Sequence, residues 1–525
     1  MKKIFTLFSA MLMSIASFAT TYNGTLTVTV NGEVSEQPTS VSIDEVNGNY
    51  KLSINNFMLV AGETPLPVGN IVIDNVSGGV NGTLTTLCAN KQINIAPGNV
   101  EGVAEDEWLG PLLGNVPVEM NARFTGEGYV VTDIHINMVE LGQVIDVKFE
   151  NVGNHFQMPN SDFETWSDKN KAPKHWHGFE SVTGSLSGSA KSDKKLVSSN
   201  NVRPGSKGLT SAVVTSTKVF TVIANGTMTN GRLAAGSMKA DNSANHSETN
   251  LSSTDKDDNG DPFATPMYAK PDSVKFWMRF TQAKAQASYP YAAFNAVITN
   301  GTYYQDPEDK NSTYNNKVAV AAPNKADMTV GDWRLVSCPF DYASYVANGA
   351  EAKAILLTVS TNATPGKGSY SNGVADSVYV DDLELVYLAD IKSVSFKGAT
   401  LDLANTDIDI ADDDVISASD FVVEKIGEDA KVTTLVEANA KGYQAVISVV
   451  SGDLNTQKTL VFNFNKPVWA DGDVNHDGVV DLADVTLLIN KVLGADATQL
   501  YNPDVNADGN VDVADVSTLV SLILG

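Results

Sequence analysis

The chain has 525 residues, which is too long for a single hydrophobic core, so about three or four domains are expected. Its formal net charge is −26, and this acidic balance excludes nucleic acid as a partner, because phosphate contacts need clustered Lys and Arg. No internal stretch approaches the roughly 18 apolar residues of a membrane-spanning helix.

The N-terminus, residues 1–19, predicts a secretory signal peptide. Two lysines precede an apolar run that extends to about Ile15, and Ser17 and Ala19 supply the small residues of a cleavage site. Cleavage is expected after Ala19, which would place the protein in the periplasm, at the cell surface or outside the cell. A buried N-terminal helix is the alternative.

Residues 20–150 alternate apolar and polar side chains with the two-residue period of β-strands. The clearest runs are 25–30, 71–73 and 145–149, and Asn-Gly turns follow at 31–32, 47–48 and 81–82. This pattern predicts an antiparallel meander, and about eight strands would close it into a barrel without exposed edges.

The stretch from Trp108 to Val118, together with Val139–Gln143, resembles the calycin-like β-barrel of exported bacterial proteins. The resemblance covers nearly the whole of residues 20–150. It implies an apolar pocket for a lipid or another small ligand. A barrel filled by its own side chains is the alternative.

Residues 151–389 contain a second set of strand motifs. They open on Asn160–Trp166 and close on Val378–Tyr387, with 275–280 and 332–336 between them. These motifs resemble a domain family assigned to carbohydrate metabolism, a β-sandwich jelly roll related in shape to many carbohydrate-binding modules. The resemblance implies a polysaccharide or other glycan as the ligand. A glycoside hydrolase or carbohydrate esterase site in the same jelly roll is the alternative, for which the sequence assigns no catalytic residue.

Candidate glycan contacts in this segment are tryptophans that would stack on sugar rings, although Trp in a sandwich is usually buried. They are Trp166, Trp176 and Trp277. Similarity to calcium-bearing carbohydrate modules also implies a structural calcium ion shared by Glu164 and Asp382.

Two other motifs of this segment are interpreted as structural. His175 and His177 alone form an incomplete metal site. The run from Asp255 to Gly260 begins like a calcium loop but lacks two required ligands, so we expect it to be solvated. It belongs to residues 241–262, a polar stretch with few apolar side chains that predicts a long mobile loop.

Residues 390–468 have a smaller set of strand signals, at 394–396, 445–449 and 460–464. They predict a small β-sandwich that acts as a spacer and has no chemistry of its own. Lys466 and Pro467 are expected to end its last strand.

The C-terminal residues 469–525 contain two twelve-residue segments, 473–484 and 504–515, that align without a gap. A Ca²⁺ ion takes about six to eight oxygens, which calcium loops supply from positions 1, 3, 5, 7, 9 and 12, with Gly at position 6 for the turn. Both segments have Gly at position 6. The expected ligands are Asp473, Asn475, Asp477, the Val479 carbonyl, Asp481 and Asp484, and then Asp504, Asn506, Asp508, the Asn510 carbonyl, Asp512 and Asp515.

Each segment gathers four Asp side chains, whose mutual repulsion without a cation predicts that calcium binding and folding are coupled. Apolar helical patterns follow the loops at 485–493 and 516–524, and none precedes them because Pro467 and Pro503 interrupt the chain. Loops without a leading helix, and with Asp instead of Glu at position 12, resemble the small all-α type I dockerin module with two bound calcium ions.

A dockerin attaches its protein to a cohesin domain, so the resemblance implies a cohesin-like partner. Partner recognition in the family involves the two residues after the position-9 Asp, which here are Leu482–Ala483 and Val513–Ala514. The alternative is a module that docks onto its own neighbouring domain. These observations together predict a mainly β, exported, glycan-associated binding or accessory protein in polysaccharide utilisation, with no membrane span.

Overall fold

The computed structural model describes residues 20–60, 65–139, 142–169, 171–219, 221–495 and 500–525. The protein is mainly β, with 46% strand and 10% helix, so the predicted fold class is confirmed. The predicted signal peptide lies outside the described residues. The described chain forms two compact units: one joins the residues before 394 to 423–434 and 447–459, and the other comprises 394–422, 435–446 and 460–525.

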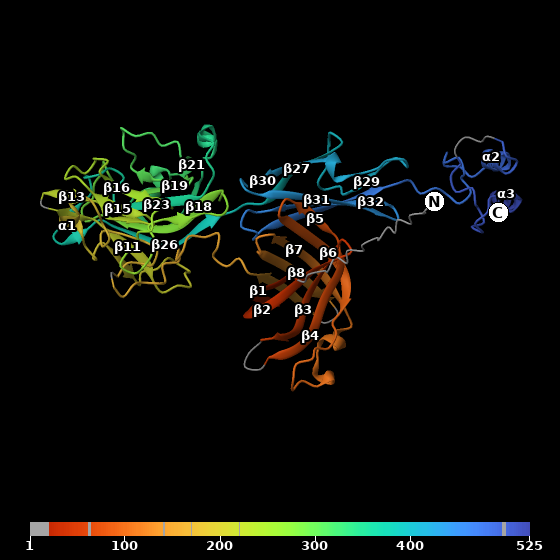
Figure 1. The fold of residues 1–525 in the computed structure, drawn as a ribbon, viewed down its shortest axis with the longest axis horizontal. Coiled ribbons are helices and arrows are strands. Elements are labelled where there is room, and N and C mark those ends of the chain that lie inside the picture. The colour runs from red at the N-terminus through yellow and green to blue at the C-terminus, as the bar shows by residue number, and fades with distance from the viewer. Residues whose placement is uncertain (1–19, 61–64, 140–141, 170, 220, 496–499) are drawn as a thin grey trace, which may run out of the picture. The chain divides into compact units, whose positions relative to one another are not determined.

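The N-terminal segment folds into a nearly closed antiparallel barrel, drawn in red and orange in Figure 1. Its strand order is β4-β3-β2-β1-β9-β8-β7-β6-β5. The strands are β1 (Thr20–Val30), β2 (Glu33–Val46), β3 (Asn49–Leu59), β4 (Leu66–Val76), β5 (Gly78–Asn81), β6 (Leu84–Asn94), β7 (Asn115–Thr125), β8 (Val130–Met138) and β9 (Gln143–Glu150). The pairing of β1 with β9 joins the two ends of the segment, which a meander needs in order to close.

The inward positions of the barrel strands form one packed core. Leu26, Leu52, Ile73 and Met120 are at most 1% exposed and belong to the same cluster. These side chains occupy the interior, because strand alternation sends every second residue inward. The structure therefore favours the side-chain-filled barrel over a ligand carrier.

Gly69 in β4 is a point where the barrel backbone leaves no room for a side chain. Its φ is +128°, and a Cβ there would lie 2.2 Å from the Ala96 carbonyl oxygen. Gly69→Ala is therefore expected to destabilise the protein by about 3 kcal/mol in urea unfolding. The matched variant Gly102→Ala also needs a positive φ, +90°, but meets nothing within 4 Å, so about 1 kcal/mol is expected. Equal losses in the two variants would contradict this account.

The second segment is a sandwich of antiparallel sheets, in yellow and green in Figure 1. One sheet has the order β10-β11-β26-β18-β22, with β10 (Leu196–Ser199), β11 (Ser211–Thr215), β26 (Ser377–Val386), β18 (Ser273–Thr281) and β22 (Gly331–Pro339). The other has the order β14-β23-β19-β21, with β14 (Thr227–Thr229), β23 (Ala354–Ser360), β19 (Ala293–Thr299) and β21 (Lys317–Ala321), and β17 (Thr265–Pro266) pairs with β23. A buried apolar cluster with members on both sheets forms the core between them.

Smaller elements surround this sandwich. They are the sheet β15 (Arg232–Ala235), β16 (Asn245–Thr249) and β20 (Tyr304–Asp306), the hairpins β12 (Thr217–Val219) with β13 (Val222–Ala224) and β24 (Tyr370–Ser371) with β25 (Val374–Ala375), and the helix α1 (Ser187–Ala190). Strand β16 contradicts the mobile loop predicted for 241–262. That prediction was wrong because backbone pairing with β15 and β20 orders a segment that has few apolar side chains of its own.

Residues 390–468 form two small sheets. The first has the order β28-β27-β30, with β27 (Asp390–Phe396), β28 (Ala399–Thr400) and β30 (Phe421–Ile426). The second has the order β29-β33-β32-β31, with β29 (Asp407–Asp409), β31 (Lys431–Asn439), β32 (Gly442–Val450) and β33 (Gln457–Asn465). The turn between β32 and β33 packs against the barrel, where Leu454 and Val450 share a cluster with Leu84 and Val131.

The C-terminal segment holds two helices, α2 (Leu482–Val492) and α3 (Val513–Leu524). They pack on each other through Val485, Leu488 and Leu519. None of the described helices is long and apolar enough to cross a membrane.

Candidate functional site

The two predicted calcium loops have the same internal hydrogen bonds. In each, the position-1 Asp accepts the backbone N–H groups of positions 5 and 6, at 3.2 and 3.0 Å in the first loop and 3.0 and 2.8 Å in the second. The position-12 Asp accepts the backbone N–H groups of positions 3 and 9, at 3.1 and 2.9 Å in the first loop and at 3.1 and 2.8 Å in the second. The residues at the first and last predicted ligand positions thus make the same backbone contacts in both copies.

The backbone of both loops turns at the same two positions. Position 4 has a left-handed φ, +56° at His476 and +57° at Ala507. Position 6 follows with +91° at Gly478 and +89° at Gly509. Gly adopts such angles without steric cost, which explains its presence at position 6 of both copies.

Helices α2 and α3 begin within the loops and orient the last two ligand positions. Asp481 and Asp512, at position 9, are the N-cap residues, and each accepts the N–H of the second residue after it. The position-12 residues, Asp484 and Asp515, close the capping box and are 0% exposed. Asp closes the box here in place of the Glu or Gln that is usual at the third helical position.

The donor set of each loop fits a hard cation, because all six predicted ligands are oxygens. Asp473, Asp484 and Asp515 are at most 3% exposed. Backbone N–H donors, first that of Asp512, lower the pKa of Asp515 and so favour its charged form. Among the described residues, no three or more His, Cys, Asp and Glu side chains converge on one point, and in the loops the carboxylates accept these backbone donors instead.

The predicted recognition pairs lie at the exposed starts of the two helices. Leu482 is 74% exposed and Val513 is 66% exposed, and Ala483 and Ala514 are also exposed. An exposed branched apolar side chain in the same place on both copies is suited to contact with another protein surface.

Sequence reasoning missed an aromatic stack in this module. The His476 ring lies between Trp469 and Tyr501, with centroid distances of 4.5 and 4.0 Å. His476 occupies position 4 of the first loop, where the second loop has Ala507, and this difference, one of three between the two loops, was the available signal. Trp469 precedes the first loop and Tyr501 precedes the second, so the stack packs both of these segments against the first loop.

The three candidate tryptophans of the second domain have different surroundings. Trp176 is 1% exposed and its Nε1 donates to the Pro159 carbonyl at 3.1 Å, so its ring is not available to a sugar. Trp166 is partly buried and donates to the carbonyl of Phe163 at 2.6 Å. Trp277 lies on the outer face of β18, with the Arg203 guanidinium 5.4 Å from its ring centre.

Glu164 and Asp382, the predicted pair of calcium ligands in this domain, have separate partners. Glu164 accepts the backbone N–H groups of Leu209 and Thr210, both at 2.9 Å. Asp382 forms an ion pair with Arg203. The shared calcium ion stays a prediction that none of these contacts supports.

Two motifs interpreted as structural come together in space. His177 Nδ1 lies 3.7 Å from Asp257 Oδ2, and the two side chains are 0% and 1% exposed. His175 Nδ1 lies 3.6 Å from Asp261 Oδ1. The predicted solvated loop is therefore partly buried, because the segment 255–261 packs against the histidines; burial lowers the pKa of His177.

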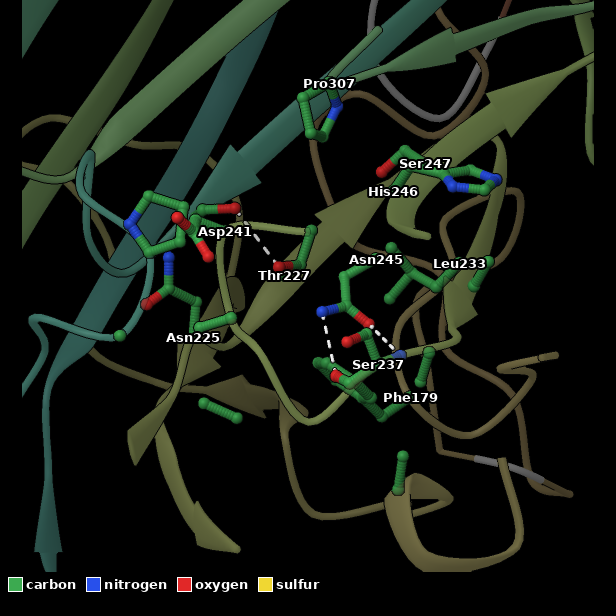
Figure 2. A pocket seen from close by; sticks show the side chains of 18 of the residues that line it. Phe179, Asn225, Thr227, Leu233, Ser237, Asp241, Asn245, His246, Ser247 and Pro307 are labelled. Carbon is green, nitrogen blue, oxygen red and sulfur yellow. Dashed lines mark hydrogen bonds between the residues drawn. The ribbon is translucent and has the colours of Figure 1, made fainter. Parts of the chain in front are cut away.

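A cavity of about 520 Å³ lies in the second domain, beside β14, β23 and β19 (Figure 2). Thr227, Leu233, His246 and Ser247 are among the residues around it. The glycan-contact tryptophans are not among the residues that line it in the described chain. No local motif marks this cavity, since its walls come from residues 179 to 366.

The chain thus combines a β-barrel, a β-sandwich and a C-terminal pair of loop-helix repeats. Comparison with known families agrees: residues 18–154 match the Calycin-like beta-barrel domain, and residues 471–524 match the Dockerin type I domain. The predictions of a calycin-like barrel and a type I dockerin are confirmed. Type I dockerins bind calcium, imply a cohesin partner and are typical of secreted or cell-surface proteins.

No curated protein matches the chain. Among the solved structures that match is a protein of Bacteroides thetaiotaomicron described as a "putative glycoside hydrolase". It is 10% identical with a TM-score of 0.30, over 69% of this chain and 84% of that chain. A likeness at this level bears on neither fold nor activity, and the carbohydrate-metabolism resemblance of residues 151–389 stays a prediction.

Proposed function

We propose that this chain is an exported, non-catalytic glycan-binding accessory protein that is attached to a cohesin-bearing partner through a dockerin with two bound calcium ions. The observation that carries the proposal is the duplicated loop network, in which the first and last Asp of each loop accept the same backbone N–H groups. The glycan as ligand rests on the resemblance of residues 151–389 to a carbohydrate-metabolism family.

The calcium ligands of the proposal are the six oxygens of each loop named in the sequence pattern. A Ca²⁺ ion held by these ligands would supply two positive charges against the four carboxylates of each loop and would hold the loop against the following helix. The chain's own residues contribute the turn at Gly478 and Gly509 and the helix caps at Asp481 and Asp512.

The partner surface of the proposal comprises Leu482 and Val513 with the alanines that follow them. Two Asp substitutions, Leu482→Asp and Val513→Asp, are expected to lower affinity for a cohesin domain by about a hundredfold, because each buries a charge at an apolar contact. Each single variant is expected to lose less affinity for the cohesin domain, since the recognition pair of the other loop is unchanged.

The measurement is binding of the full chain to a panel of immobilised type I cohesin domains, with calcium and with a chelator. Val468→Asp is the matched control, because Val468 is 92% exposed and precedes the matched dockerin residues. Binding that persists in the chelator, or that the double variant leaves intact, would refute the assignment of this surface.

The glycan part of the proposal has its own experiment. A glycan array with the calcium-loaded full chain is expected to show retention without release of reducing sugar. Release of reducing sugar would favour the hydrolase alternative, and no retention by any glycan would refute the glycan ligand while leaving the dockerin assignment intact.

A further inference from the structure

The cavity of the second domain exists because one sheet face has small side chains. On β19 the residues alternate, so Phe294 and Ala296 enter the core while Ala293 and Asn295 line the cavity. Thr227 of β14 with Thr358 and Ser360 of β23 continue this face. Small side chains along three adjacent strands leave a hollow where larger ones would fill the space.

Apolar side chains form the facing walls. Leu233 belongs to a separate small cluster against which Phe179 and Leu186 pack, and Met238 also lines the cavity. Val219 and Val222 of the hairpin β12–β13 line the cavity as well. A site of this size with mainly apolar walls is typical of pockets for small molecules, whereas sugar chains are held by aromatic platforms.

The charges around the cavity select against anions. Asp306 and Asp241 line it, and none of the lining residues within the described chain is Lys or Arg. His246 is already engaged, since its ring nitrogens contact the Ser243 carbonyl at 2.7 Å and the Glu248 carboxylate at 3.3 Å. An anionic ligand would meet the Asp241 carboxylate and the Asp306 carboxyl group without a free basic partner.

Asp306 is an acidic residue of the cavity lining, at the end of strand β20. Burial raises its pKa above the ordinary value for Asp, and its neighbour Asn295 lowers it by a hydrogen bond. A buried carboxyl of this kind can donate to a neutral ligand or accept from a cationic one.

From these walls and charges we propose that the cavity binds a small neutral or cationic molecule with an apolar body, whose polar end meets Asp306. This site goes beyond the glycan and dockerin functions and does not depend on either. It places small-molecule binding in the sandwich domain.

The test uses two dyes that share one ring system. N-phenyl-1-naphthylamine is neutral, and 8-anilino-1-naphthalenesulfonate adds one negative charge. Fluorescence titration of the full chain is expected to show binding of the neutral dye. The affinity for the anionic dye is expected to be lower by about tenfold or more. Absence of neutral-dye binding, or equal binding of both dyes, would overturn the proposal.

A substitution in the cavity lining tests whether the neutral dye binds in this cavity. Ala293→Trp places a large ring in the cavity and is expected to reduce neutral-dye affinity by about tenfold or more. Ala287→Trp is the matched control, because Ala287 is exposed in the same domain and does not line the cavity. The affinity of this variant for the neutral dye should stay within about twofold of that of the unchanged protein. Equal affinities for the two variants would overturn the site.

Two further measurements test a sugar as the ligand and test dependence on calcium. Displacement of the neutral dye by xylohexaose would show that the cavity is a sugar site and would overturn the apolar ligand. Dye binding is expected to be unchanged by a calcium chelator, so failure of the dockerin proposal and failure of this one are distinguishable.

Discussion

Replacing Asp484 and Asp515 together with alanine is expected to abolish calcium binding and to unfold α2 and α3. Each side chain is fully buried and accepts two backbone N–H groups of its own loop. The change removes a ligand, leaves two donors unpaired and breaks the capping box, and loss of such a cap alone costs about 1 kcal/mol per helix. Titration calorimetry of the full chain would report the ions, and amide hydrogen exchange would report the helices.

The control for this experiment is Asp471→Ala. Asp471 is an exposed acid that precedes the first loop by two residues, so two bound ions and protected helices are expected. The single variant Asp484→Ala should retain one ion, because the second loop has its own complete network. Helices that remain protected in the double variant would contradict the coupling of calcium binding to folding.

A large loss of stability is expected on substitution of Arg123 in the barrel. Its guanidinium side chain is 0% exposed, donates from Nε to the Leu454 carbonyl at 2.6 Å and from Nη2 to the Asn455 carbonyl at 2.8 Å, and pairs with Asp133. Burial lowers the pKa of Arg123, and Asp133 opposes this shift. Arg123→Met is expected to destabilise the first unit by about 3 to 5 kcal/mol, because two carbonyls and a carboxylate lose their donor.

Urea unfolding followed by tryptophan fluorescence would measure this loss, since Trp108 is buried in the same barrel segment. The control is Lys148→Met, which removes another cation that donates to Asn455, in a solvent-exposed hydrogen bond of 3.1 Å. That exposed contact is expected to contribute less than about 0.5 kcal/mol. Similar losses for Arg123→Met and Lys148→Met would show that the barrel does not depend on the buried contact.

The dockerin could be predicted in detail because its chemistry is local. All six predicted ligands of each site lie within twelve residues, and a fixed spacing defines both the ligands and the turn between them. The helix starts were less accurate: the apolar pattern predicts Val485 and Val516, whereas the helices begin at Leu482 and Val513. The difference arises because the position-9 Asp caps the helix, an effect of hydrogen bonding that apolar periodicity does not report.

Strand periodicity predicted the barrel for a similar reason, since alternation of inward and outward residues is local. The interior could not be predicted, because whether it is filled or hollow depends on side chains from strands that are distant in sequence. The same limit applied to Asp257, which the polar sequence around it predicts to be solvated and which the fold buries against His177.

Composition, period-two alternation and the spacing of Asp, Asn and Gly thus determined the mainly β class, the barrel and the dockerin with its two predicted calcium loops. Only the tertiary structure decided that Trp176 is buried, that the barrel is packed, and that a cavity lies beside β14, β23 and β19. The physical reason is the range of the contacts: a calcium loop closes on itself, whereas the cavity needs residues from Phe179 to Gly366 to meet.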